Sequence, residues 1–119
     1  MAWGALTVAY QNVVPVRLSQ DVFTTSYKVI YRAPSNARVY IKDISIANIS
    51  GGPINISVFI VPAGTTISSY NALLYLVTVA KNSYLQWTGT QILNPNDSLQ
   101  ISSDTLNGGT IVVSGGEAT

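Results

Sequence analysis

The strongest constraint on the fold is that apolar residues recur at every second position in short runs. In residues 54–60, the even positions are all Ile or Val, and the odd positions are Asn, Ser and Phe. Such alternation is typical of a β-strand with one face in a core. No segment of ten or more residues shows the 3.6-residue period of an amphipathic helix. The chain is therefore predicted to be all-β.

Runs of this kind repeat along the chain and are separated by turn-forming residues. They predict strands at residues 7–16, 23–31, 37–49, 54–60, 72–80, 84–93, 98–102 and 110–114. Turns are predicted at Gly51-Gly-Pro53 and Asn94-Pro-Asn-Asp97, and the longest loop at 62–71. About eight short strands at this spacing predict an antiparallel β-sandwich of Greek-key or jelly-roll type.

Two irregularities are predicted within these strands. In residues 37–49 the apolar phase changes from odd positions (Val39, Ile41) to even positions (Ile44, Ile46), which indicates a β-bulge. Pro15 indicates an edge strand or a bulge in the first run, since Pro has no N–H to donate to a neighbouring strand.

The length of 119 residues fits one domain. We expect residues 1–20 to be an N-terminal arm with a candidate first edge strand. Residues 21–115 are expected to form the β-sandwich domain. Residues 116–119 are expected to be a short, loosely held C-terminal tail.

The composition argues against several kinds of chemistry. The chain has no Cys and no His, so zinc sites built on these residues, thiol nucleophiles and a Ser-His-Asp triad cannot form. The chain has six Lys and Arg and five Asp and Glu, which gives a net charge of +1. Nucleic-acid-binding proteins normally carry a strongly basic patch, so we expect no nucleic-acid binding. We expect no enzyme activity, no cofactor and no metal.

The carboxylates have simpler expected roles than catalysis. Asp97 lies in a turn, where its side chain is expected to cap the backbone. Asp43 is expected to form a local ion pair with Lys42, and Glu117 to lie near a loosely held end. We also expect no membrane insertion. The chain does not begin with a signal-peptide pattern, and the longest apolar stretch, residues 72–80, is too short to span a bilayer.

Hidden apolar surface is the main functional signal. Residues 72–80 are apolar on both faces, yet a two-layer sandwich covers only one face of a strand. Only 9% of the residues are charged, which favours oligomerisation or docking into a larger assembly. The candidate subunit interface is Leu73, Tyr75 and Val77, which share one phase of this run.

Aromatic residues offer two further hypotheses. Trp3 and Leu6, in an uncharged N-terminal segment, are candidate arm anchors that dock on their own domain or on a neighbouring chain. Trp87 shares its phase with Leu85 and Leu93 and is expected in the core. The alternative is a carbohydrate-binding platform made of Tyr70, Tyr84 and Trp87.

The order of turns and apolar positions over residues 27–115 resembles a group of small single-domain β-sandwich virion proteins of tailed bacteriophages. The landmarks are Tyr31-Arg-Ala-Pro34, Ile46-Ala-Asn-Ile-Ser-Gly51, Val61-Pro62, Asn71-Ala-Leu-Leu74, Leu93-Asn-Pro-Asn-Asp-Ser-Leu99 and Val113-Ser-Gly115. One turn departs from the pattern, because Asn-Pro-Asn-Asp stands where Pro-Gly-Asp is expected. Residues 1–20 fall outside the resemblance.

The resemblance implies a virion protein. Taken together with the aromatic residues, the sequence leaves three functional hypotheses open. The first is a capsid decoration (cement) protein, a homotrimer that binds the major capsid protein and bridges capsid subunits through sandwich edges and the N-terminal segment. The second is a tail, neck, baseplate or fibre accessory protein, bound to tail proteins. The third, of a different class, is a stand-alone carbohydrate-binding module.

Overall fold

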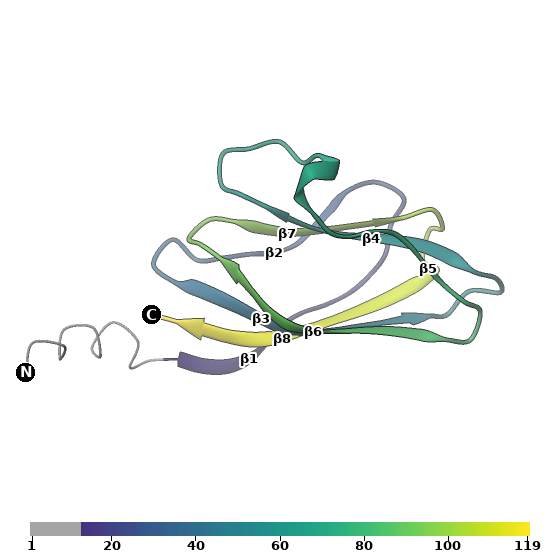
Figure 1. The fold of residues 1–119 in the computed structure, drawn as a ribbon, viewed down its shortest axis with the longest axis horizontal. Coiled ribbons are helices and arrows are strands. Elements are labelled where there is room, and N and C mark those ends of the chain that lie inside the picture. Colours follow the sequence, from purple (N-terminus) through teal and green to yellow (C-terminus); the bar gives the residue numbers. More distant parts are fainter. Residues whose placement is uncertain (1–12) are drawn as a thin grey trace, which may run out of the picture.

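The computed structural model describes residues 13–119, which form two four-stranded antiparallel sheets packed face to face (Figure 1). Sheet A contains, in spatial order, β1 (Val13–Val22), β8 (Gly109–Ala118), β3 (Arg38–Asn48) and β6 (Tyr84–Leu93). Sheet B contains β2 (Lys28–Arg32), β7 (Ser98–Ser103), β4 (Ile54–Val61) and β5 (Ala72–Val79). The predicted antiparallel sandwich of eight strands is confirmed.

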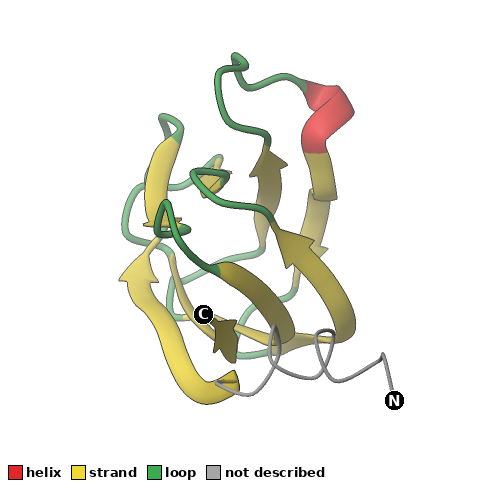
Figure 2. Ribbon diagram, turned by 90° about the vertical axis from the view of Figure 1, so that its left-hand side faces the viewer, coloured by secondary structure: helices red, strands yellow, loops and turns green. Residues whose placement is uncertain are grey.

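The strand order is that of a jelly roll. Strands pair in a nested way, β1 with β8, β2 with β7, β3 with β6 and β4 with β5, and two further pairings, β3 with β8 and β4 with β7, complete the sheets. The chain changes sheet at every connection except the one between β4 and β5. That connection holds a short 3-10 helix, η1 (Ser69–Asn71), and projects beyond sheet B on the side away from sheet A (Figures 1 and 2).

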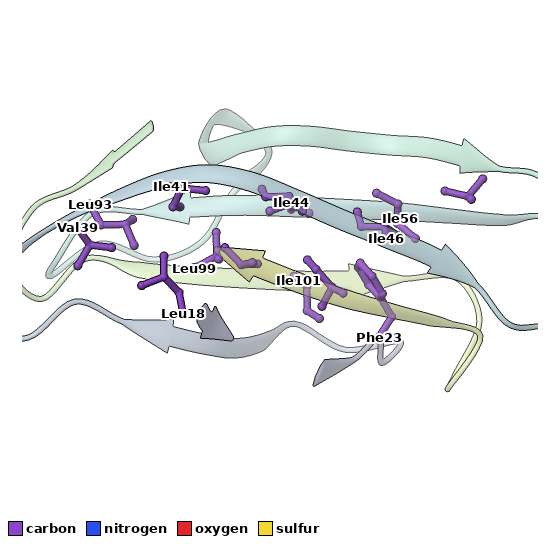
Figure 3. Packing of buried hydrophobic residues seen from close by; sticks show 14 of the residues in the cluster. Leu18, Phe23, Val39, Ile41, Ile44, Ile46, Ile56, Leu93, Leu99 and Ile101 are labelled. Carbon is purple, nitrogen blue, oxygen red and sulfur yellow. The ribbon is translucent and has the colours of Figure 1, made fainter. Parts of the chain in front are cut away.

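The core lies between the sheets and is made of inward-facing aliphatic residues and Phe23 (Figure 3). β3 shows the predicted bulge, because its register with both β6 and β8 shifts between Ile41 and Asp43. The extra residue at Lys42 lets Val39 and Ile41 face the core before the shift, and Ile44 and Ile46 after it. The change of apolar phase therefore predicted this bulge correctly.

The first third of the chain differs from the prediction. Within the described residues, β1 runs from Val13 to Val22, six residues past the predicted end at 16, and β2 begins at Lys28 instead of residue 23. Phe23 lies between the two strands with its ring fully buried, and its N–H donates to the Gly109 carbonyl (2.9 Å). Pro15 does lie on an edge strand, as predicted, but the register shift of β1 falls between Arg17 and Ser19.

The C-terminal end is also held more firmly than expected. β8 continues to Ala118, so most of the predicted tail at 116–119 is strand, and the predicted domain start at residue 21 falls inside β1. Gly115 lies so close to β3 that a Cβ atom there would stand 1.7 Å from the Tyr40 carbonyl oxygen. The Glu117 carboxylate accepts a hydrogen bond from the Tyr31 hydroxyl (2.5 Å), which links β8 to sheet B.

Candidate interaction surface

A row of aromatic residues crosses the outer face of sheet B. Phe59 of β4 alternates with the core residue Val58 and therefore points away from the core, yet it is only 1% exposed. The Tyr27 ring meets it edge-on from beside β2 at a centroid distance of 5.4 Å. The Tyr75 ring of β5 meets it from the other side at 6.4 Å. Both tyrosines remain more than half exposed, so the row presents aromatic surface to solvent.

A bulge in β5 places Tyr75 on this face. The register between β4 and β5 shifts on both sides of Val58, and Leu76 has a φ of 51°, a left-handed conformation that is uncommon for Leu. The Leu76 N–H donates to the Ser57 Oγ of β4 (2.9 Å), which satisfies the backbone group that the bulge removes from the ladder. Leu76 and Tyr75 are consequently both exposed.

The same bulge changes the expected interface. Leu73 and Val77 pack against the core of their own sandwich, together with Leu74. The prediction that Leu73, Tyr75 and Val77 share one face is therefore wrong, because it assumed an uninterrupted period of two. Of these three residues only Tyr75 presents an exposed side chain, at 53%.

Charge is unevenly divided between the two sheets. β4, β5 and β7 contain no charged residue, and β2 contains only Lys28 and Arg32. Lys28 turns toward sheet A and forms an ion pair with Asp21 of β1 (2.6 Å). The strands of sheet A carry the other strand charges, Arg17, Asp21, Arg38, Lys42, Asp43 and Glu117. The aromatic row thus lies among the neutral side chains of β4, β5 and β7, and the nearest charged residues, Arg32 of β2 and Asp104 after β7, lie at the border of this face.

The carboxylates are committed to structural contacts. The buried side chain of Asp97 accepts hydrogen bonds from the N–H groups of Ala63 (2.8 Å) and Asn94 (2.9 Å), which confirms its predicted capping role. Asp104 accepts from the N–H and the side-chain amide of Asn55, both at 3.0 Å. The backbone hydrogen bond from Asn55 is the main cause that lowers the pKa of Asp104.

Asp21, Lys42 and Asp43 also bind partners within the protein. The hydrogen bond from Lys28 lowers the pKa of Asp21. The predicted ion pair between Lys42 and Asp43 is wrong. Lys42 donates to the Thr90 hydroxyl across the sheet (2.7 Å), while Asp43 accepts from Gln86 (2.9 Å). The bulge at residue 42 turns the two neighbours toward different partners.

The predicted carbohydrate platform is not assembled. Trp87 is partly buried and packs against the core, as its phase indicated. Tyr70, 97% exposed, borders an open pocket of about 370 Å³ that also includes Gln91. Tyr84 lies at the opposite end of β6, and seven residues of strand separate it from Gln91 by roughly 23 Å. The three aromatic rings therefore cannot contact one sugar.

The remaining expectations concern the N-terminal arm, metal binding and membrane insertion. Trp3 and Leu6 lie outside the described residues. Within residues 13–119, no group of three or more acidic side chains is placed to hold a metal ion, and no helix has the length and apolar character needed to cross a membrane.

Tyr27, Phe59 and Leu76 of the candidate interaction surface were not singled out from the sequence. The available signal was Phe59, an apolar residue at an otherwise polar position of its strand.

Comparison with known proteins gives a likeness of fold. No family model matches the chain, and no curated protein matches its sequence. A chain from the acidic stable capsid structure of Helicobacter pylori bacteriophage KHP30 superimposes with a TM-score of 0.52 at 11% identity. The match covers 91% of this chain and 94% of that chain. A chain from Bacillus endospore appendages, which form a novel family of disulfide-linked pili, gives 0.52 at 16% identity, over 91% and 88%. At such identities the comparison shows a shared jelly-roll fold.

Proposed function

We propose that this protein is a non-enzymatic structural component of a tailed-phage virion, a capsid decoration (cement) protein that binds the head surface as a homo-oligomer. The observation that carries this proposal is the whole-chain likeness to a chain of a phage capsid structure, which matches almost end to end on both sides. The resemblance of the turn pattern over residues 27–115 to tailed-phage virion proteins supports the same location independently.

The side chains support a structural role. Asp21, Asp97, Asp104 and Glu117 each hold two segments of the fold together, and Asp43 bonds across two strands of sheet A. A glycosidase needs two carboxyl groups facing a common substrate, whereas each of these groups faces a partner within the protein. Pilus formation through disulfide links is disfavoured, because this chain contains no cysteine with which to make one.

Attachment to the head is proposed to use the sandwich edges and the N-terminal segment. The edge strands are β1 and β6 in sheet A and β2 and β5 in sheet B, so each leaves one row of backbone N–H and C=O groups without a strand partner within the described residues. Trp3 and Leu6 are the proposed anchors of the N-terminal arm. Weak contacts of this kind hold a lattice together when symmetry repeats them many times.

The test is the copy number of this chain in purified particles, measured by quantitative mass spectrometry against the major capsid protein. A decoration protein is expected at a number on the order of hundreds per particle, because it follows the symmetry of the head. A variant that lacks residues 1–6 is expected to give fewer copies at an unchanged melting temperature of the free protein. A few dozen copies or fewer would instead assign the protein to the tail or neck, and absence from particles would overturn the virion assignment.

A further inference from the structure

We infer that the outer face of sheet B is a self-association surface, on which a second copy of this chain packs face to face. The face consists of the outward residues of β2, β7, β4 and β5 around the aromatic row of Tyr27, Phe59 and Tyr75. This assignment rests on the proposed function only for the expectation of a homo-oligomer. It holds or fails independently of a location on the phage head.

The absence of charge from β4, β5 and β7 is the first reason for choosing a second copy as the partner. When a surface packs against itself around a two-fold axis, every charged group near the axis meets a like charge. The middle of the outer face of sheet B avoids this repulsion, because β4, β5 and β7 carry only neutral side chains, while Arg32 of β2 and Asp104 after β7 lie at its border. The outer face of sheet A carries Arg38 and Lys42 on its central strand β3, so self-packing there would bring cations together.

The exposed apolar groups on this face are held in fixed positions, which is the second reason. Tyr27 and Tyr75 are braced edge-on by the buried ring of Phe59. Leu76 is fixed in a left-handed bulge by its hydrogen bond to Ser57. Association therefore costs little additional ordering of these side chains. The face also lies within the strand layer of a rigid sheet, where large rearrangements on binding are uncommon.

The size of the face sets the expected strength. The four strands have five, six, eight and eight residues and lie about 4.8 Å apart, so they cover roughly 430 Å² per copy, or roughly 860 Å² for the pair. This is below the area of a standard specific interface and within the range of weak, transient ones. We therefore expect a reversible dimer with a dissociation constant on the order of tens of micromolar. Face-to-face packing gives a dimer, whereas the resemblance to decoration proteins implies a trimer.

Sedimentation equilibrium of the free protein, from about 1 to about 500 µM, tests this geometry. The weight-average mass is expected to rise from the chain mass of 12.7 kDa toward twice that value. Tyr75→Asp is expected to weaken association at least about tenfold, because each dimer would bury two new carboxylates. The matched control is Tyr84→Asp, which changes an exposed tyrosine on β6 of sheet A and is expected to leave the dissociation constant unchanged.

A second variant covers the case in which Tyr75→Asp disturbs the fold, as checked by circular dichroism. Leu76→Asn keeps a residue that tolerates the left-handed conformation, yet it removes the apolar group from the face. This variant is also expected to raise the dissociation constant. A monomer throughout the concentration range, a trimer, or equal weakening by Tyr84→Asp would overturn the proposed surface. None of these results would alter the copy number in particles, so failure of the surface and failure of the virion role are distinguishable.

Discussion

Asp97 offers the most direct test of how one end of the sandwich is held together. The residue is 7% exposed, and its carboxylate accepts hydrogen bonds from the backbone N–H groups of Ala63, in the β4–β5 loop, and Asn94, in its own turn. Its backbone carbonyl accepts from the N–H of Ala33, in the β2–β3 loop (2.8 Å). Asp97 thus connects three loops that are far apart in the sequence.

Replacing Asp97 by Ala removes only the two side-chain bonds, and their loss sets the expected magnitude. A hydrogen bond to a charged group contributes about 1.5–3 kcal/mol, and a buried N–H without a partner costs a similar amount. Asp97→Ala is therefore expected to lower the free energy of unfolding by about 3–5 kcal/mol. For a domain of this length the melting temperature should fall by about 10–20 °C.

The assay is urea unfolding followed by circular dichroism, with Asp104→Ala as the matched control. Asp104 also accepts two N–H donors, both from Asn55, but its carboxylate is exposed and water replaces it. Its loss is expected to cost less than about 1 kcal/mol. Equal destabilisation by the two variants, or a loss below about 1 kcal/mol for Asp97→Ala, would refute the reasoning from burial.

Two further variants test other contacts. Gly115→Ala is expected to cost more than about 3 kcal/mol in chemical denaturation, because its Cβ would overlap the Tyr40 carbonyl, whereas Gly51→Ala, with open space around it, should be nearly neutral. Burial and the Glu117 carboxylate raise the pKa of Tyr31 above its ordinary value of 10.0, so this residue stabilises the fold fully below pH 10 and progressively less as the pH rises above it. Tyr31→Phe should lower the free energy of unfolding at pH 7 by about 1 kcal/mol. It should also reduce the drop in this free energy between pH 9 and pH 11. If the variant shows the same drop as the parent protein, the alkaline destabilisation comes from groups other than Tyr31.

Local patterns in the sequence predicted most of the strands. The alternation in residues 54–60 corresponds to β4, and the phase change in residues 37–49 corresponds to the bulge at Lys42. Both signals depend only on which residues face the core. The Asn94–Asp97 turn was predictable for a different local reason, because Asp97 bonds to a residue of its own turn.

The errors occur where a distant segment decides the local structure. Phe23 has the composition of a strand residue, yet it fills a gap in the core between β1 and β2. The bulge at Leu76 depends on the hydroxyl of Ser57, nineteen residues earlier in the chain. Because no local rule contains that contact, Tyr75 was assigned to the same face as Leu73 and Val77.

The neutral face of sheet B shows why the candidate surface needed the topology as well as the sequence. Residues 44–80 contain no charged side chain, and this stretch includes β4 and β5. It also includes the second half of β3, which belongs to sheet A and directly follows the charged residues Lys42 and Asp43. The nested pairing of the jelly roll separates β3 from β4 and brings β7, also uncharged, beside β4. The uncharged strands β4, β5 and β7 thereby lie side by side in one sheet, where self-packing avoids like-charge repulsion.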